Sequence, residues 1–413
     1  MKPALLSAKT TKVAGICDKI ILFSIYAVVF FLPISKGIIE TFSSIAIVFF
    51  IIKKLIEKKD IAGNLNINLA VMAYTIICFI SIFISSNPAI SFRSFWGKIM
   101  QDVAFFFVVV GTLNTERRLK NTAYILFASS LLIGIDGIYQ HFTLKEFIRH
   151  RRAAFPDRIS SAFITPNDFA CYLVTVIPFT LSLFFVKFRF KIFRLFIAAL
   201  FILLLSCLIL TVSRGAWIAF IVLALFMSVW LIPLRLLLLL LVPAIIGSLT
   251  FFPSIVKERL SNFFIFLDNS GIDRKIIWEA AWKMFMSRPW LGLGLGTFMF
   301  NFDKFVIKNY PYGPSYAHNC YLQMGSEIGI IGLVSFLSIL GLFFYRGIKK
   351  LNHGQKTFFW YVLMGSLAAI LGYSVHMGVD TFLYSVDLGL LFWLILGMGV
   401  AAGENVICAP KSN

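Results

Sequence analysis

Charged side chains are scarce in this chain: they make up 14% of the 413 residues, whereas hydrophobic residues make up 59%. The mean hydropathy is +0.88, and phenylalanine alone occurs 46 times. A water-soluble domain of this length needs far more polar surface than this composition supplies. The composition therefore excludes a soluble globular protein, gives no reason to expect a nucleic-acid partner, and predicts an all-α polytopic membrane protein surrounded by membrane lipids.

Cysteine and acidic residues are also sparse, and their spacing carries no metal signature. The six cysteines show neither paired nor zinc-type spacing, which argues against a disulfide framework and against structural zinc. The 19 acidic residues include no Asp-x-Asp pair of the kind that holds a metal against phosphates. We expect no metal and no cofactor.

Long apolar runs, by contrast, occupy most of the chain. A helix crosses a bilayer's hydrocarbon core with about 20 apolar residues, and the stretch from Leu195 to Leu234 holds only one charge, Arg214, near its middle. We interpret this stretch as two crossings joined by a tight turn. The whole pattern predicts about twelve membrane helices in a single integral membrane domain, residues 1–413, near 20–34, 37–52, 66–85, 96–113, 121–141, 167–186, 195–212, 216–232, 235–252, 328–345, 358–377 and 383–402.

The basic residues predict the orientation of these helices. Alternate short connections are rich in lysine and arginine, and the lysine-rich N-terminus falls on the same side by parity. The positive-inside rule then puts these connections and both termini in the cytoplasm. The two longest connections, 142–166 and 253–327, fall outside and are also basic. Long loops translocate regardless of charge, and an anionic partner at the outer face is a second explanation; we expect that both apply.

The outer loop 253–327 contains an expected amphipathic helix and, we expect, part of the active site. Asp273 is a candidate N-cap for a helix that begins at Arg274, with Trp278, Trp282 and Phe285 spaced for one face. Ser287-Arg288-Pro289 would end this helix. The run Gly292-Leu-Gly-Leu-Gly296 follows without a preceding strand, so we interpret it as a close turn toward the membrane and not as a dinucleotide site.

Ionisable residues inside the spans gather in one leaflet. Such residues are costly in a membrane and are functional candidates. With the orientation above, all of them fall in the outer half, which favours a polar cavity open to the outside over scattered structural ion pairs: Lys98, Asp102, Asp136, His141, Asp168, Arg214, Glu327, His376, Asp380 and Asp387.

Three segments carry the candidate chemistry. The first segment is Thr211-Val-Ser-Arg-Gly-Ala-Trp217, which holds Arg214 in the tight turn. An arginine at a helix end can extend its side chain to lipid headgroups. Because Arg214 is the only charge in so short a turn, we favour a phosphate or carboxylate ligand instead. Arg274 begins the second segment, with Lys275 as a further candidate; an isolated loop arginine is more often simply solvated. The structural alternative and the binding role both remain open for Arg274.

The third segment places His318 directly before a helix at the outer face. A lone histidine is usually structural, yet Asn319, Gln323 and Glu327 continue from it as a polar strip with helical spacing. A neutral imidazole accepts a proton from a hydroxyl group, which makes His318 the candidate base, with Glu327 as a candidate to orient it.

A fourth, weaker segment begins at Arg158, which is a further candidate for the positive site. Pro166-Asn167 lies eight residues downstream and is interpreted as the cap of the sixth helix.

In this order and topology, these segments resemble the O-antigen ligase family. The matching residues are Ser213-Arg214-Gly215-Ala216-Trp217; Arg274 four residues before Trp278, then Arg288-Pro289 and the glycine run; His318-Asn319 with Gly329; and Arg158 with Pro166-Asn167. The likeness covers most of the chain from about residue 150 onward. Trp278 stands where the family motif often has leucine, and the glycine usual after the Arg158 position is replaced by serine and alanine.

The resemblance implies a metal-independent, inverting glycosyltransferase of the membrane-embedded C type in the bacterial inner membrane, with a periplasmic active site. The donor would be a glycan on undecaprenyl diphosphate and the acceptor a lipid A–core sugar or another glycan end. Arg214 and Arg274 would hold the diphosphate, and His318 would be the base.

Alternatives remain open at this point. An O-antigen or capsule polymerase, or a ligase for protein acceptors, would use the same kind of donor. A transporter of an anionic solute is the rival from another class, although it should show repeats and charges near the midplane. A structural scaffold would leave Arg214 and His318 without a purpose.

Overall fold

The computed structural model describes residues 2–60, 67–187, 190–231, 269–307, 310–311 and 313–407, with the side chains of 2–11 and 269–273 left aside. The expected ninth membrane helix, 235–252, and the start of the large outer loop lie outside the described residues. Within the described ranges the chain is helical, apart from one antiparallel bridge between Lys145 and Arg152.

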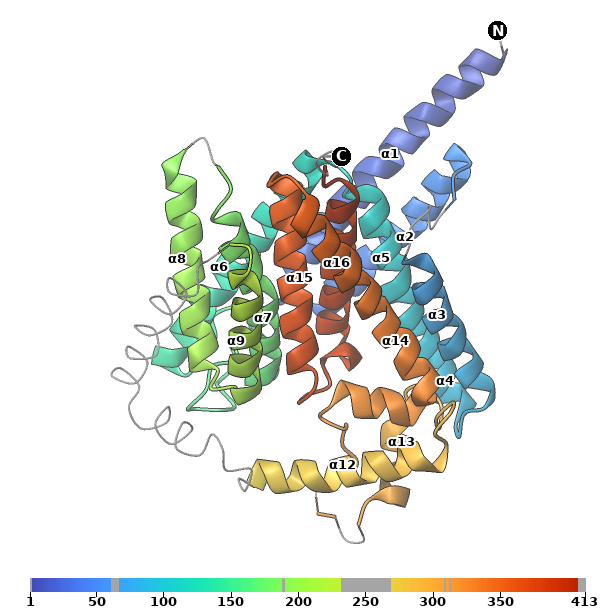
Figure 1. Cartoon of the computed structure of the whole chain (residues 1–413), viewed down its shortest axis with the longest axis vertical. Coiled ribbons are helices and arrows are strands. Elements are labelled where there is room, and N and C mark those ends of the chain that lie inside the picture. The colour runs from blue at the N-terminus through green and yellow to red at the C-terminus, as the bar shows by residue number, and fades with distance from the viewer. Residues whose placement is uncertain are drawn as a thin grey trace.

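The helices follow one another with short connections. Their bounds are α1 Lys2–Phe31, α2 Lys36–Glu57, α3 Asn68–Phe83, α4 Pro88–Ser94, a π-helical turn η1 Phe95–Met100, α5 Gln101–Thr112, α6 Glu116–Thr143, α7 Pro166–Leu183, α8 Lys191–Leu210, α9 Arg214–Ser228, α12 Asn269–Ser287, α13 Phe298–Phe305, α14 Cys320–His353, α15 Phe358–His376, a 3₁₀ turn η2 Phe382–Tyr384, and α16 Val386–Glu404 (Figure 1).

The chain is a polytopic membrane protein. Seven segments among the described residues are long and apolar enough to cross a bilayer: Lys12–Phe31, Pro88–Thr112, Glu116–Thr143, Lys191–Leu210, Cys320–His353, Phe358–His376 and Val386–Glu404. Two shorter apolar helices, α3 and α9, lie in the same bundle (Figure 1). Large apolar side chains such as Leu69 (79% exposed) and Phe83 (73%) face outward, as suits a surface solvated by acyl chains.

The fourth expected span begins earlier than its hydropathy indicated. We predicted it near 96–113, whereas the helical segment starts at Pro88. Asn87 caps this start, because its side chain accepts a hydrogen bond from the Ile90 N–H at 3.2 Å, and proline at the first helical position has no N–H to satisfy. The π-helical turn then interrupts the segment midway.

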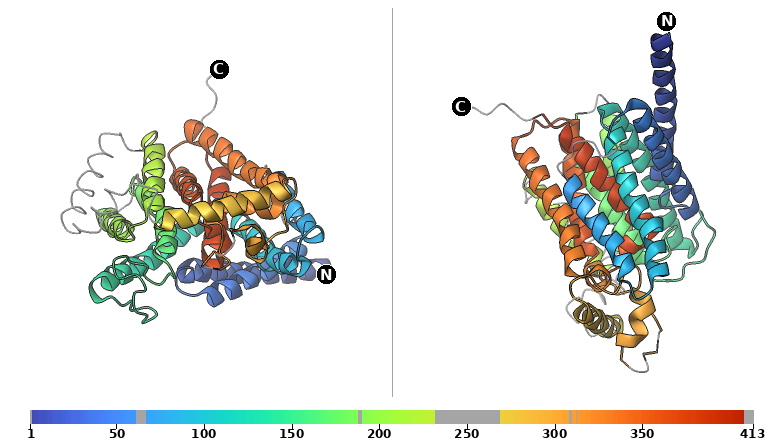
Figure 2. Two further views of the ribbon diagram at one scale, coloured as in Figure 1. Left: turned by 90° about the horizontal axis from the view of Figure 1, so that it is seen from below. Right: turned by 90° about the vertical axis from the view of Figure 1, so that its right-hand side faces the viewer.

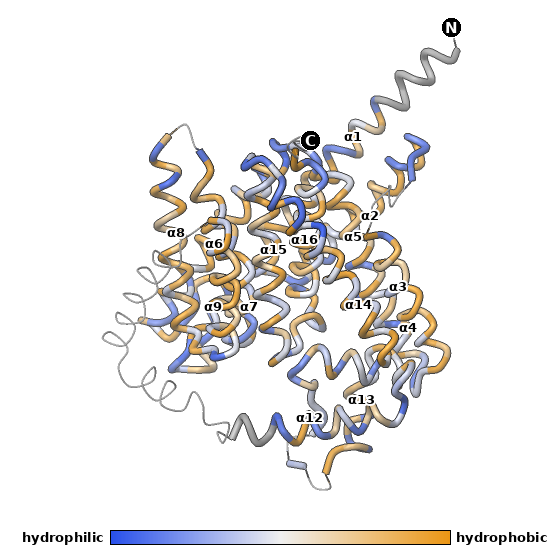
Figure 3. Tube along the Cα trace, viewed as in Figure 1, coloured by the Kyte–Doolittle hydropathy of each residue, from blue (hydrophilic) through white to orange (hydrophobic). Residues whose placement is uncertain are grey.

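The centre of the bundle is formed by α15 and α16. Of the 18 residues in the apolar stretch of α16, 89% are buried. In α8, at the periphery of the bundle, the buried share of the corresponding stretch is 28%. α15 packs against α7, α9 and α16, so its residues, including the fully buried Trp360, are enclosed on all sides. Hydrophobic residues fill the middle of the bundle and hydrophilic ones collect toward its ends (Figure 3).

The two ends of the bundle differ in character. At one end, Asp18 of α1 accepts hydrogen bonds from Lys53 of α2 and Arg118 of α6, which ties three helices together. The start of α1 and the end of α16 lie at this same end (Figure 1). At the opposite end, α12 runs across the face of the bundle, as the view from below shows (Figure 2).

The segment that contains α12 and α13 folds onto this opposite end with a small core of its own. α12 and α13 bury Ile277, Ala281, Met284, Phe298 and Phe302 between them. α12 starts at Asn269, so the prediction of Asp273 as its N-cap was wrong: Asp273 lies one turn inside the helix. The helix ends at Ser287, as predicted.

The aromatic residues expected on one face of α12 differ in their exposure. Trp282 is 54% exposed, whereas Trp278 is half-buried and donates its indole N–H to the carbonyl of Ala317 at 3.0 Å. Trp278 therefore links α12 to the loop that carries His318. This contact gives a physical reason for an aromatic residue at position 278.

The glycine run forms the close turn that its sequence predicted. Gly294 has a φ of +113°, and a Cβ there would lie 2.1 Å from the Oγ of Ser85. Its N–H donates to the carbonyl of Glu327 at 2.8 Å. Only a residue without a side chain permits both this backbone conformation and the close approach to Ser85.

Candidate active site

A cavity of 620 Å³ opens where the ends of several helices meet, at the end of the bundle that α12 crosses. Four residues predicted from the sequence line it together: Arg158, Arg214, Arg274 and His318. They come from four separate segments, namely the loop before α7, the start of α9, α12, and the loop before α14. Of the ten ionisable residues expected to gather in one polar cavity, four line this one: Asp168, Arg214, His376 and Asp380.

Arg214 is the first residue of α9, and the turn from α8 comprises only residues 211–213. Ser213 is the N-cap, but its side chain makes no capping hydrogen bond. Ser213, Arg214 and Gly215 all line the cavity, so the N-terminus of α9 opens onto it. A helix N-terminus carries roughly half a positive charge, which adds to the charge of the guanidinium group.

Gly215 permits the close packing of this turn. A Cβ at position 215 would lie 2.5 Å from Val379 and 3.1 Å from the imidazole of His376. His376 is itself buried, with Nε2 3.4 Å from the hydroxyl of Ser213. The turn that carries Arg214 is therefore held against the end of α15.

Arg158 is held from two sides. Its Nε donates to the carbonyl of Thr211 at 2.7 Å, and its Nη2 donates to Oδ1 of Asn167 at 2.8 Å. Thr211 ends α8 next to the Arg214 turn, so two arginines that lie far apart in sequence are brought to neighbouring places in the cavity wall.

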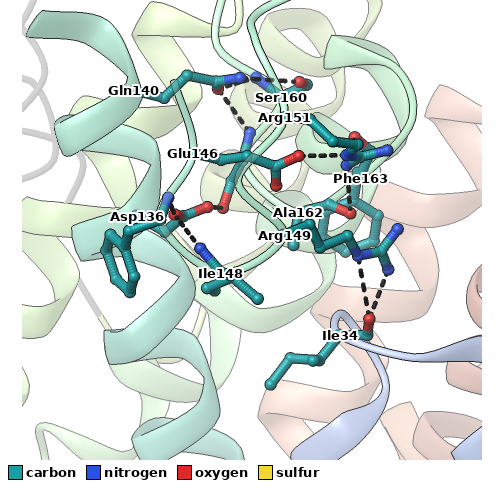
Figure 4. A network of polar contacts seen from close by, with 12 residues as sticks. Ile34, Asp136, Gln140, Glu146, Ile148, Arg149, Arg151, Ser160, Ala162 and Phe163 are labelled. Atoms are coloured by element: carbon teal, nitrogen blue, oxygen red, sulfur yellow. Dashed lines mark hydrogen bonds and ion pairs between the residues drawn. The ribbon is translucent and has the colours of Figure 1, made fainter. Parts of the chain in front are cut away.

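The loop that carries Arg158 is anchored by buried polar side chains of α6 (Figure 4). Asp136 accepts hydrogen bonds from the Phe147 N–H at 2.7 Å and the Ser161 hydroxyl at 2.6 Å. Gln140 accepts from the N–H groups of Ser160 and Ser161, both at 2.8 Å. These bonds replace the water that a loop backbone would otherwise need, and they fix the loop on both sides of Arg158.

An ion pair between a buried glutamate and an exposed arginine of the same loop adds to this anchoring. Glu146 is 2% exposed and pairs with Arg151, as Figure 4 shows. Burial raises the pKa of the Glu146 carboxyl, and the neighbouring Arg151 guanidinium opposes that rise. Arg149 reaches further and donates to the carbonyl of Ile34 in the first hairpin, so the loop is also attached to the α1–α2 connection.

His318 forms a pair with Asp380. The Nδ1 atom of His318 lies 3.0 Å from Oδ1 of Asp380, which follows α15. His318 has a φ of +47°, an unusual conformation for a residue with a side chain, and it stands just before Asn319. Asn319 caps α14 by accepting from the Tyr321 and Leu322 N–H groups, both at 3.0 Å, which fixes the backbone on the far side of His318.

Asp380 is held as a carboxylate. Burial alone raises its pKa, but the hydrogen bonds from His318 and the Thr381 N–H and the charge of Arg274 outweigh burial and lower the pKa below its ordinary value. An ionised carboxylate only accepts hydrogen bonds, so Nδ1 of His318 carries a hydrogen, and in the neutral imidazole the lone pair then lies on Nε2.

Sequence reasoning placed Asp380 among the outer ionisable residues but did not pair it with His318. The two residues are 62 positions apart, and no local spacing connects them. His376, another of the predicted ionisable residues, and Lys36, which the sequence did not single out, also line the cavity. Lys36 comes from the first hairpin, the part of the chain in which no motif was recognised.

Glu327 does not orient His318. Its carboxylate instead accepts hydrogen bonds from the Gly296 N–H at 2.8 Å, the Phe298 N–H at 3.3 Å and the Gln323 amide at 3.3 Å. It is 1% exposed and does not line the cavity, so it fixes the glycine turn on α14. Lys275 is exposed on α12 and likewise lies outside the cavity lining.

The interpretation of Pro166-Asn167 as a helix cap was also wrong in detail. The N-cap of α7 is Thr165, whose hydroxyl accepts from the Asp168 N–H at 3.1 Å, and Pro166 occupies the first helical position. The Asn167 side chain instead contacts Arg158 and Asp380, at 2.8 Å and 3.0 Å.

Comparisons with known proteins match the part of the chain that carries these residues. Residues 198–337 match the family model described as O-antigen ligase, and this segment contains Arg214, Arg274 and His318. A protein of Rickettsia conorii (strain ATCC VR-613 / Malish 7), named as a proposed polysaccharide ligase, is 27% identical over 177 residues. The aligned part is 40% of each chain, so the chain matches less than half the length of this relative. The segment 198–337 is therefore similar to the O-antigen ligase family.

Proposed function

We propose that this protein is a glycosyltransferase that moves a glycan from undecaprenyl diphosphate to a hydroxyl group of a lipid A–core sugar. One observation carries the proposal: a single cavity is lined by three arginines and by a histidine whose Nδ1 is held by a carboxylate. These groups can neutralise a diphosphate and accept a proton at one place, which are the two needs of glycosyl transfer from a lipid diphosphate.

The pair of His318 and Asp380 activates the acceptor in this proposal. Asp380 keeps the hydrogen on Nδ1, so the lone pair on Nε2 of His318 takes the proton of the acceptor hydroxyl. The acceptor oxygen then forms a bond to the anomeric carbon of the donor sugar. General base catalysis of this kind typically contributes about 10²–10⁴-fold to the rate.

Arg214 and Arg274 stabilise the leaving group. As the bond between the anomeric carbon and the diphosphate oxygen breaks, its electron pair stays on the diphosphate, where negative charge builds up. Two guanidinium groups and the N-terminus of α9 stabilise that charge more in the transition state than in the bound donor. Arg158 adds positive charge beside them. Attack on the face opposite the leaving group inverts the anomeric configuration.

The cations of the cavity are side chains in this mechanism, so we expect transfer to be independent of divalent metals. Lys275 and Glu327 are not part of the mechanism, because neither lines the cavity. Arginine suits the task better than lysine, since its planar fork binds two phosphate oxygens at once.

We infer a topology of twelve spans with both termini in the cytoplasm of a bacterial inner membrane. The cavity and the segment 253–327 would then face the periplasm, where the lipid-linked donor and the acceptor are both accessible. The basic connections Lys53–Lys59 and Arg117–Lys120, which carry the ion pairs to Asp18, support this orientation through the positive-inside rule.

The test is His318→Ala in the source cells, with His353→Ala as the matched control. His353 is an exposed histidine at the far end of α14. We expect His318→Ala to accumulate lipid-linked glycan and to leave lipid A–core bare on a lipopolysaccharide gel, at normal protein levels in the membrane. Normal glycan transfer by His318→Ala would refute the proposal.

A deletion strain tests the acceptor. Long lipid-linked chains together with bare lipid A–core indicate a ligase. Single repeat units on the core would instead indicate a polymerase that uses the same donor, and the same His318 and arginine roles would then apply to a lipid-linked glycan acceptor.

A further inference from the structure

Asn167 joins the two halves of the cavity wall. Its side chain does not cap a helix, because Thr165 is the N-cap of α7 and Pro166 is the first helical residue. The amide Nδ2 donates to Oδ2 of Asp380 at 3.0 Å, and Oδ1 accepts from Nη2 of Arg158 at 2.8 Å. We propose that Asn167 is a positioning residue that holds Arg158 and the Asp380–His318 pair as one hydrogen-bonded unit; this role rests on the proposed function.

The chemistry of the partners determines the orientation of the amide. A guanidinium group only donates hydrogen bonds, and an ionised carboxylate only accepts them. The Asn167 oxygen must therefore face Arg158 and its NH₂ group must face Asp380. An amide satisfies both partners at once, whereas a side chain that only donates or only accepts would leave one of them unsatisfied.

Asn167 also separates two opposite charges. Without Asn167 between them, the Arg158 guanidinium group and the Asp380 carboxylate would form a direct, strong pair. Such a pair would draw Asp380 away from Nδ1 of His318 and Arg158 away from the Arg214 turn. The neutral spacer leaves Oδ1 of Asp380 to His318 and the Nε of Arg158 to Thr211.

The result is a continuous chain of hydrogen bonds. It runs from the carbonyl of Thr211 through Arg158, Asn167 and Asp380 to the imidazole of His318. One end lies beside the arginines that hold the leaving group and the other end is the base. A shift of the loop that carries Arg158 is thereby transmitted to His318.

The alternative is a purely structural role, in which Asn167 only links α7 to the loop after α15. Kinetics distinguish this structural role from the positioning role. Asn167→Asp replaces the NH₂ donor by an oxygen about 3 Å from the Asp380 carboxylate. Two carboxylates this close share one proton, and only the protonated pair retains a donor between them. The other charged or titratable residues that line the cavity are Lys36, Asp168, Arg214, Arg274, Tyr316, His376 and Tyr384.

The experiment measures release of undecaprenyl diphosphate from lipid-linked glycan extracted from the source membranes, with purified full-length protein. We expect Asn167→Asp to lose activity more steeply than the wild type as the pH rises from about 4 to 8, by roughly tenfold or more, as the shared proton leaves. Asn87→Asp is the matched control: it makes the same charge change at the cap of α4, outside the cavity lining, where aspartate caps as well as asparagine. Its pH profile should equal that of the wild type.

Asn167→Ala tests the same idea without a new charge. Loss of a group that orients a functional side chain typically lowers activity about 10–100-fold, and we expect a drop in that range together with a raised KM for the donor. The double variant with Arg158→Ala should be no worse than the poorer single variant, because the two residues act as one unit. Additive losses, or an Asn167→Asp profile parallel to that of the wild type, would overturn the role of Asn167.

His318→Ala separates this inference from the proposed function. If His318→Ala is active, the proposed function fails whatever Asn167 does. If His318→Ala is inactive and the Asn167 variants behave like the wild type, only the positioning role fails.

Discussion

Asp380→Asn is the most direct test of the base. The substitution keeps the shape of the side chain but removes the negative charge that holds the hydrogen on Nδ1 of His318. A hydrogen bond to a charged group contributes about 1.5–3 kcal/mol. The His318 side chain is 39% exposed and that of Asp380 15%, so solvent screening favours the lower half of this range.

A loss of about 1.5–2 kcal/mol corresponds to a fall in kcat/KM of about 10- to 30-fold, since each 1.36 kcal/mol is a factor of ten. The assay is release of undecaprenyl diphosphate by purified protein. Asp303→Asn is the control, because Asp303 is an exposed carboxylate on α13 and does not line the cavity. It should leave the rate unchanged.

The pH dependence of this defect follows from the lowered pKa of Asp380. A carboxylate with a lowered pKa contributes its full stabilisation above the ordinary Asp value of about 3.9 and loses it as the pH falls through the lowered pKa. Titration of the Asp380 carboxyl itself should therefore add no pH dependence to the ratio of wild-type to Asp380→Asn rates above about pH 5. A wild-type rate for Asp380→Asn at about pH 8 would refute the role of the Asp380 carboxylate.

Three further outcomes are expected. Arg214→Lys should weaken binding of undecaprenyl diphosphate by roughly tenfold or more, measured by calorimetry in detergent, because a point charge does not reproduce the bidentate fork; equal affinity would remove Arg214 from the diphosphate site. Glu327→Ala should lower the free energy of unfolding by about 1–3 kcal/mol, seen as a lower Tm, because the carboxylate accepts hydrogen bonds from the N–H groups of the glycine turn. The folded protein should keep its KM for the donor, and a raised KM at unchanged Tm would contradict this. Gly294→Ala should lower the free energy of unfolding by about 1–3 kcal/mol, seen as a lower Tm, because alanine is strained at a φ of +113° and its Cβ would meet Ser85. Gly341→Ala, with open space around it, should leave the Tm unchanged.

Local patterns were enough to establish the class of protein and most of its membrane helices. A bilayer has a fixed thickness, so apolar length alone reveals a crossing, as in α8 and α9 on either side of Arg214. Proline and glycine in the sequence located the end of α12 and the turn at the glycine run. It did not locate the start of α12, because the buried face of that helix depends on its contacts with α13 and α14 and not on its own sequence period.

The sequence by itself also indicated Arg158, Arg214, Arg274 and His318, because a charge beside a membrane span needs a reason. Only the tertiary structure decided which groups these residues meet. Asp380 reaches His318 across 62 positions, and Asn167 reaches Asp380 across 213. Glu327 has helical spacing from the His318 segment, yet it faces the glycine turn. Spacing along one helix fixes which face a residue occupies, but the packing of other helices fixes what lies opposite that face, and those helices come from distant parts of the chain.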